Sequence, residues 1–313
     1  MSQEAGHLPF NDYGTWIRKQ LGCRVQKLSV DAGLTCPNRD GHLSRGGCSF
    51  CDNSAFTPSY CQGLSGVKAQ LEAGKAFYGR KYPTMRYLAY FQSYSNTYAP
   101  LDKLKRLYEE ALSTEDVVGI VISTRPDCLP PATLRYLDAL NRETFLIVEI
   151  GIESADDATL RRINRGHDFA CSRTAIANLA ACGIRTGGHV ILGLPGEDEA
   201  SMLQQAHTIS QLPLTLLKLH HLQIIRGTQM AKAYEAGEIS TMEAGTYLHV
   251  VAQYISRLRA DLVLERQFTS SPLDKVLSPH WGLKPGRLTE MLCDYMRANE
   301  LWQGKDAYFK NFS

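Results

Sequence analysis

The sequence lacks the features that would place the chain in a membrane or outside the cell. No run approaches the roughly 18 consecutive apolar residues that a transmembrane helix requires. Residues 1–12 lack the basic and then apolar pattern of a secretory signal. Nine cysteines without an export signal argue against a disulfide framework, because the cytosol keeps thiols reduced. We therefore expect a cytoplasmic protein with no membrane segment.

Fingerprints of nucleotide-phosphate binding are missing as well. No GxGxxG follows the first expected strand, and no P-loop lysine motif occurs anywhere. The net charge is only +2, although the first hundred residues carry eleven Lys and Arg against six Asp and Glu. Such an excess can attract a polyanion, but it is more often a solvated surface. Charge alone therefore leaves nucleic-acid binding open.

Apolar runs in the chain predict a parallel sheet. Six strands are expected, at 24–30, 86–91, 117–122, 145–150, 189–192 and 216–222. Helical segments separate them, at 66–78, 101–112, 131–140, 156–163, 172–181 and 198–212. Most of the strands are continuous apolar runs, which is typical of strands buried on both faces. Six such units favour a full or partial barrel over a dinucleotide-binding sheet.

The expected domain organisation has three parts. Residues 1–22 form an N-terminal lead-in with a helix at 8–21, and residues 23–237 form the barrel. Residues 238–313 form a C-terminal cap, in which helices at 241–259 and 287–300 flank an irregular stretch rich in proline and serine. No internal repeat or low-complexity segment divides the chain further.

One loop, at 31–53, carries three cysteines directly after the first expected strand: Cys36, Cys48 and Cys51. Its other residues are mostly small, polar or turn-forming, so its order has to come from something that the thiols hold. Three thiolates can hold three irons of a [4Fe–4S] cluster and leave the fourth iron open. They can also hold zinc, completed by His42 or by a distant cysteine, or remain unligated. The cysteines alone slightly favour zinc.

The surroundings of these cysteines change that balance, because the sequence here resembles the radical S-adenosylmethionine (SAM) enzymes. Those enzymes carry CxxxCxxC in the first βα loop, with an aromatic residue before the last cysteine; here Phe50 precedes Cys51, but eleven residues replace three between Cys36 and Cys48. The stretch CPNRDGHLSRGGCSFC resembles the YhcC/YtqA branch, which is related to the Elongator catalytic subunit and to oxygen-independent coproporphyrinogen oxidase. Further matching segments are YFQSYSNT, STRPDC, EIGIES, RINRGHDFAC, GLPGE and KLHHLQII.

The resemblance covers about residues 25–237 and implies a fold, two cofactors and a set of site residues. The fold is α/β, a partial (β/α)6 TIM-type barrel of the radical SAM type with a helical C-terminal extension. The cofactors are a [4Fe–4S] cluster and SAM, whose amino and carboxylate groups chelate the fourth iron. The implied ligands and contacts are Cys36, Cys48 and Cys51 for the cluster, Phe50 and Ile191 for the adenine, Gln92 and Ser93 for the SAM amino group, Glu153 and His189 for the ribose, and Arg165 for the SAM carboxylate.

Several of these residues have a simpler interpretation. Glu149 or Glu153 could be a buried carboxylate paired with Arg161 or Arg165 and serve structure alone. The arginines near 161–165 could form an exposed helix face. His220 and His221, at the end of the last expected strand, are as consistent with a core position as with catalysis. The turn in GLPGE could merely close a strand.

The remaining six cysteines divide into two groups. Cys128 and Cys171 follow barrel strands and are the catalytic candidates, because a thiol there could pass a hydrogen atom or an electron to a substrate radical; an inert thiol is the alternative. The other four are expected to be structural: Cys23, Cys61, Cys182 and Cys293.

The resemblance implies reductive cleavage of SAM to methionine and a 5′-deoxyadenosyl radical, which abstracts hydrogen from a substrate. The expected substrate is a tRNA wobble-uridine side chain, and the expected electron donor is flavodoxin or ferredoxin. Because no acetyltransferase domain is present, we expect alteration of an existing uridine substituent. The alternatives are a porphyrinogen-like small-molecule substrate and a non-enzymatic zinc-binding module. The insert 37–47 is expected to form a flap in which Arg39 and Arg45 touch the substrate.

Overall fold

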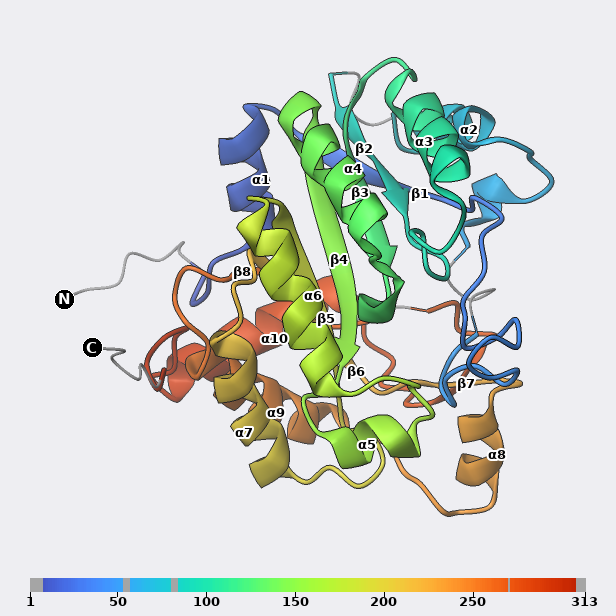
Figure 1. Cartoon of the computed structure of the whole chain (residues 1–313). Helices are drawn as coiled ribbons and strands as arrows, with labels where there is room; N and C mark the ends of the chain where they lie inside the picture. The colour runs from blue at the N-terminus through green and yellow to red at the C-terminus, as the bar shows by residue number, and fades with distance from the viewer. Residues whose placement is uncertain (1–7, 53–56, 80–83, 270, 308–313) are drawn as a thin grey trace.

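A seven-stranded parallel sheet forms the centre of the computed structural model, which describes residues 8–52, 57–79, 84–269 and 271–307. Asn53, where the expected cysteine loop ends, lies outside these ranges. The strand order is β1-β2-β3-β4-β5-β6-β8, and every neighbouring pair is parallel. The sheet curls into a half-barrel (Figure 1). Its strands are β1 (Val25–Val30), β2 (Arg86–Phe91), β3 (Val117–Thr124), β4 (Phe145–Glu153), β5 (Arg185–Leu192), β6 (Leu216–His221) and β8 (Val263–Arg266).

Helices cover the outer face of the sheet. The larger ones are α2 (Val67–Gly79), α3 (Leu101–Leu112), α4 (Pro131–Glu143), α6 (Phe169–Ala181), α7 (Glu199–Ser210), α9 (Ala244–Ser256) and α10 (Pro285–Ala298). Their apolar faces share one core with outward-facing strand residues such as Leu28, Ile120 and Leu146. None of the helices in the described ranges is long and apolar enough to cross a membrane.

Helix α1 (Tyr13–Leu21) closes the inner face of the half-barrel at the amino ends of the strands. Its Ile17 is buried in a cluster with Leu88 and Val121, and the Trp16 ring lies 6.2 Å from that of Phe145. This apolar layer blocks one end of the interior. Any site must therefore open at the carboxyl ends of the strands, as in other barrels.

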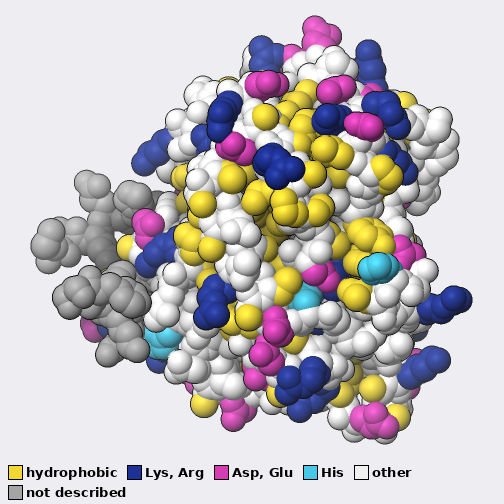
Figure 2. Space-filling view, viewed as in Figure 1, with side chains coloured by type: hydrophobic (Ala, Val, Ile, Leu, Met, Phe, Trp, Pro, Cys, Tyr) yellow, Lys and Arg dark blue, Asp and Glu magenta, His cyan; other side chains and the backbone are white. Residues whose placement is uncertain are grey.

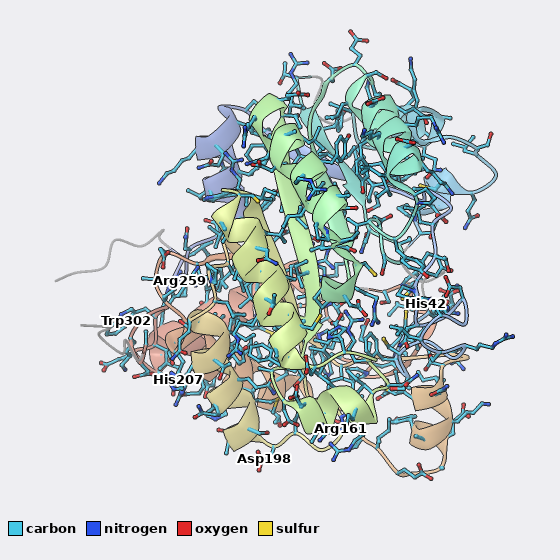
Figure 3. All side chains as sticks on the ribbon, in the orientation of Figure 1. His42, Arg161, Asp198, His207, Arg259 and Trp302 are labelled. Carbon is cyan, nitrogen blue, oxygen red and sulfur yellow. The ribbon has the colours of Figure 1, made fainter. Side chains whose placement is uncertain are left out.

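Local capping explains where several helices begin. Asp198 accepts a hydrogen bond from Ser201 N at 2.8 Å, and the Ser201 hydroxyl accepts one from Asp198 N at 2.9 Å, so a capping box starts α7. Asp198 and His207 mark the two ends of this helix in Figure 3. Arg259 fixes the chain after α7 by donating to the carbonyl oxygens of Ser210 and Leu212.

The sheet has one strand more than the six that the sequence predicts. β8 comes from the region after residue 237, which is expected to be helical and irregular. It has only four residues and pairs only with β6 among the described strands, so it offers no long apolar run to recognise. Two further elements were also not expected, the short helix α8 (Gln229–Glu235) and an antiparallel ribbon of β7 (Ile224–Ile225) and β9 (Val276–Ser278).

Candidate active site

A pocket opens at the carboxyl ends of the strands, where the barrel argument places the chemistry. Nine of the twelve residues that the sequence analysis names as site residues line it together. These are Cys36, Cys48, Cys51, Phe50, Gln92, Glu153, Arg165, His189 and Ile191. The structure thus brings together residues that are up to 155 positions apart in the chain, 36 to 191. Their individual roles stay predictions.

The cysteine loop is held in place from two sides. Ser49 N donates to the carbonyl oxygen of Ile163 at 2.9 Å, and the Ser49 carbonyl oxygen accepts from Met230 N, in α8, at 2.9 Å. The Asn164 side chain donates to the Gly47 carbonyl oxygen at 2.8 Å, and Asn164 itself has a positive φ of 53°. The RINRGH segment after helix α5 (Asp157–Arg162) therefore positions the loop. That segment matched the family pattern, but its contact with this loop could not be read from the sequence.

The three thiols lie in a setting that suits a cationic partner. Cys48 Sγ accepts from Arg165 Nη1 at 3.5 Å and from Asn38 Nδ2 at 3.6 Å. Burial, together with the neighbouring Cys48 and Cys36, raises the pKa of Cys51 to about 12. Thiols grouped out of water remain neutral unless a metal takes up the thiolate charge. The donor set therefore fits a metal centre.

A [4Fe–4S] cluster and a single metal ion place different demands on the arrangement of these side chains. Within the described ranges, no three side chains of His, Cys, Asp or Glu are grouped as ligands of one metal ion. A tetrahedral zinc site needs its ligand atoms about 2.0–2.3 Å from one point. A [4Fe–4S] cluster instead binds each thiolate through a different iron, so its ligands need not converge. His42, the proposed fourth zinc ligand, is exposed on the flap at the side of the molecule (Figure 3).

Glu153 and Arg165 meet beside the thiols. Arg165 Nη2 lies 3.3 Å from Glu153 Oε1 and donates to the Gly151 carbonyl oxygen at 2.6 Å. Glu153 has a positive φ of 67°, a strained conformation for a residue with a side chain, and such strain is concentrated at functional sites. A Cβ atom at Gly151 would lie 2.6 Å from both charged groups, so a larger residue there would displace the ends of these two side chains. The ion pair that the structural interpretation of Glu153 predicted does form, and it forms inside the pocket.

The sequence analysis named three arginines near this site, and only one of them points inward. Arg165 is 6 % exposed, whereas Arg161 and Arg162 are exposed on α5, where Figure 3 labels Arg161. Arg162 Nη1 donates to the Pro195 carbonyl oxygen at 2.6 Å, which fixes the GLPGE turn. In the same motif Glu197 accepts from Ser154 Oγ at 2.8 Å, so this turn closes the ends of β4 and β5. The structural interpretation of GLPGE agrees with these contacts.

A layer of polar side chains lies beneath the pocket, and the sequence analysis missed most of it. Each of the seven strands of the sheet contributes one member, in strand order Lys27, Tyr90, Ser123, Glu149, His189, Lys218 and Glu265. Glu149 is at the centre, 1 % exposed, with Lys27 Nζ and Lys218 Nζ each at 2.8 Å. Although burial raises its pKa, Lys218 and Lys27 hold the pKa of Glu149 well below its ordinary value. Of the two carboxylates for which an arginine partner was considered, Glu153 has one, whereas Glu149 pairs with lysines.

Glu149 also orients the histidine that lines the pocket. His189 Nε2 lies 2.9 Å from Glu149 Oε2. An ionised carboxylate can only accept, so Nε2 donates. The His220 ring is 5.6 Å from the His189 ring, and burial lowers the pKa of His220 well below its ordinary value. Burial likewise lowers the pKa of His221, whose ring is 4.2 Å from that of Trp281, to about 4.

Ser93, Cys128 and Cys171 do not line the pocket. Ser93 is buried, with its hydroxyl 3.4 Å from that of Thr57. Cys128 is buried beside Asp127, with Sγ 3.7 Å from Oδ1. Cys171 lies at the start of α6 in a second depression, which it shares with Leu134 and Asp168. The catalytic roles of both cysteines remain predictions.

Three of the four cysteines expected to be structural contact groups that do not belong to the pocket. Cys61 is buried, and its Sγ donates to the Ser29 carbonyl oxygen at 3.4 Å. Cys293 is buried in the outer core, and Cys182 packs against that core. None of them, nor Cys23, lines the pocket.

Comparisons with known proteins agree with the fold and with this pocket. A model of the radical SAM superfamily matches residues 38–208, and a model of the radical SAM C-terminal domain matches residues 214–298. The chain therefore belongs to the radical SAM superfamily, and it is an enzyme whose cofactors are a [4Fe–4S] cluster and SAM.

Two bacterial proteins place the chain more narrowly. YtqA of Bacillus subtilis is 33 % identical over 92 % of this chain and 90 % of its own, and YhcC of Escherichia coli K12 is 36 % identical over 87 % of each. Within the superfamily the chain is a member of the YhcC/YtqA family. The solved structure of Methanocaldococcus infernus Elp3 with its N-terminus deleted shares the fold, with a TM-score of 0.67 at 16 % identity over 90 % of this chain and 64 % of that one.

Proposed function

We propose that the chain uses a cluster held by Cys36, Cys48 and Cys51, with SAM bound in the same pocket, to modify a uridine side chain in tRNA. When bound, the two cofactors supply one-electron cleavage of the SAM sulfonium and a 5′-deoxyadenosyl radical that abstracts hydrogen. The observation that carries the proposal is the meeting of three thiols with Glu153, Arg165 and His189 in one pocket.

The residues of the pocket have distinct parts in this proposal. Arg165 donates to Cys48 and is the candidate partner of the SAM carboxylate, a role that suits a guanidinium. Glu153 and His189 are the candidate ribose contacts, and Phe50 and Ile191 the candidate adenine wall. For the contact with the SAM amino group, Gln92 is a better candidate than Ser93, because Gln92 lines the pocket and Ser93 does not.

Cys128 and Cys171 remain the candidates for passing a hydrogen atom to a substrate radical. Burial raises the pKa of Cys128 to about 12, which keeps its S–H bond intact at neutral pH, as a hydrogen-atom donor requires. Cys171 is the weaker candidate of the two, since it faces the second depression.

The tRNA assignment is supported by distant relatives only. Elongator complex protein 3 of Saccharomyces cerevisiae is 26 % identical over 61 % of this chain and 34 % of its own. The tRNA uridine(34) acetyltransferase of Methanocaldococcus infernus is 22 % identical over 59 % of this chain and 34 % of its own. The chain spans about a third of each of these two relatives. A flavodoxin or ferredoxin is the proposed electron donor.

Two experiments test the two parts of the proposal. Anaerobic reconstitution should give about four irons per chain, and reduction with dithionite in the presence of SAM should release methionine and 5′-deoxyadenosine. Stoichiometric zinc without SAM cleavage would contradict the chemistry.

Mass spectrometry of tRNA nucleosides from a deletion strain should show one changed uridine derivative. An unchanged profile, with no salt-dependent tRNA binding, would favour a small-molecule substrate of the porphyrinogen kind.

A further inference from the structure

Arg125, in the STRPDC segment after β3, is a buried cation that the sequence analysis did not single out. It is 3 % exposed and lines the pocket. Its Nε and Nη2 atoms donate to the two carboxylate oxygens of Asp127, at 2.8 and 2.7 Å. Its third nitrogen, Nη1, is buried and has no partner within the described ranges. A buried guanidinium nitrogen without an acceptor, on a residue that lines a pocket, is a candidate for contact with a bound group or an ordered water.

The position of Arg125 relates it to the cysteine loop. A Cβ atom placed on Gly166 would lie 3.1 Å from Asn38 Oδ1 and 3.5 Å from Arg125 Nη2, so the guanidinium lies next to the turn that supports Cys48. Arg125 also interacts electrostatically with Cys36 and with Arg165. Both buried guanidinium groups therefore lie near the cysteine loop: Arg165 donates to Cys48 Sγ, and Arg125 lines the same pocket as Cys36.

The two cations repel each other, and a negative group between them relieves that repulsion. Asp127 balances the charge of Arg125, and Glu153 balances that of Arg165, so each cation is paired with one carboxylate. Both guanidinium groups still have one buried nitrogen without a partner among the residues that the structure describes, Nη1 of Arg125 and Nε of Arg165. The pocket thus suits an anion with several acceptor atoms. A [4Fe–4S] cluster with three thiolate ligands carries a net negative charge, and its sulfurs accept hydrogen bonds.

We propose that Arg125, with Asp127 as its counter-ion, stabilises the reduced form of the cluster and so sets its reduction potential; this rests on the proposed cluster site. Reduction adds one electron, taken from the one-electron donor, and hence one negative charge to the cluster. The potential of an iron–sulfur cluster depends on nearby charge and on hydrogen bonds to its sulfurs. A buried cation favours the more negative state, and Asp127 opposes that effect in part.

The test is a redox titration of the reconstituted protein without SAM, followed by electron paramagnetic resonance of the reduced cluster. Arg125→Gln should lower the potential, because it leaves the Asp127 charge alone near the cluster. Asp127→Asn should raise the potential, because it leaves Arg125 uncompensated. The double variant Arg125→Gln/Asp127→Asn should return close to the wild-type value. Arg161→Gln, which removes an exposed guanidinium from α5, should leave the potential unchanged because solvent screens it.

Opposite shifts in the two single variants support the proposal. Shifts in the same direction, or unshifted potentials with full iron content, overturn it. If Arg125→Gln does not retain iron, Arg125→Lys and Asp127→Asn provide the test. We expect the wild-type potential for Arg125→Lys and a raised potential for Asp127→Asn. If neither variant shifts the potential, the proposal is rejected. A wild-type protein that binds no cluster would instead refute the proposed function itself.

Discussion

Glu149 accepts hydrogen bonds from five side chains, which come from β1, β2, β3, β5 and β6. Two of the donors are lysines, and Glu265 on β8 pairs with both of them, at 2.6 and 3.1 Å. Two positive and two negative groups are therefore buried together in the barrel interior. Burial of charges is tolerated only in such balanced, hydrogen-bonded sets.

Removal of one charge from this set should be costly. We expect Lys218→Met to lower the free energy of unfolding by about 3–5 kcal/mol, because it leaves one carboxylate in excess. The double variant Lys218→Met/Glu265→Gln restores the balance and should recover part of the loss. Urea unfolding followed by circular dichroism measures both. Equal losses in the single and double variants would show that charge balance is not what holds the layer together.

His221 should make the protein sensitive to acid. Its pKa falls from the ordinary 6.5 to about 4 in the folded chain, because its ring is buried between Trp281 and Tyr247. The unfolded chain therefore binds a proton first as the pH drops, and stability is lost between about pH 6.5 and pH 4. His221→Phe keeps the ring packing and removes the titration. Its unfolding midpoint should fall less steeply with pH than that of the wild type, and parallel slopes would contradict the assignment.

At the scale of elements, the insert 37–47 contains two arginines, Arg39 and Arg45, for which the sequence analysis predicts the same contact with substrate. The structure gives them different surroundings. Arg39 Nη1 donates to the Cys51 carbonyl oxygen at 3.2 Å, and its side chain would touch a Cβ atom on Gly47 at 3.1 Å. Arg45 is exposed and lies against Gly41 of the same insert. The base of the insert is therefore built into the cysteine loop, while Arg45 is free to meet a substrate.

The two arginines should accordingly give different phenotypes. Arg39→Ala should lower the iron content after reconstitution, because it removes a contact of the loop that carries Cys51. Arg45→Ala should leave the iron content and SAM cleavage intact and weaken tRNA binding, with a smaller dependence of the affinity on salt. Iron analysis and binding at two salt concentrations separate these effects. If both variants kept full iron and turned over normally, the insert would have neither role.

The elements that were predictable are those with a local pattern. Strands such as β2 and β4 are continuous apolar runs, and the cysteines follow β1 directly, so their place at the mouth of a barrel could be predicted. The polar layer could not, because each strand shows only one isolated polar residue. Lys27 and Glu149 are partners across 122 positions of sequence, a pairing that only the curl of the sheet creates. Strand β8 was missed because its four residues offer no long apolar run.

At the scale of the whole molecule, charge is spread rather than concentrated. Figure 2 shows basic and acidic side chains interspersed over the face with the covering helices, with apolar side chains between them. No strong field of one sign is visible on this face, which fits the net charge of +2. RNA contact, if the proposed function holds, should therefore be concentrated at the pocket mouth rather than on this face.

The region after residue 237, expected to be a C-terminal cap or small subdomain, supplies the last strand of the half-barrel. It supplies β8 with Glu265, the core residues Tyr247 and Leu292, and the pocket-lining Thr269. A chain that ends at Gly237 would leave Lys27 and Lys218 with Glu149 as their only carboxylate partner among the described residues, and would expose the β6 edge. We expect this fragment, residues 1–237, to be insoluble or to unfold without cooperativity. As a control, a protease site at the exposed Gly237, cut after folding, should give two pieces that elute together with the cluster bound. A soluble 1–237 fragment that melts cooperatively and binds iron would show instead that the barrel is a domain by itself.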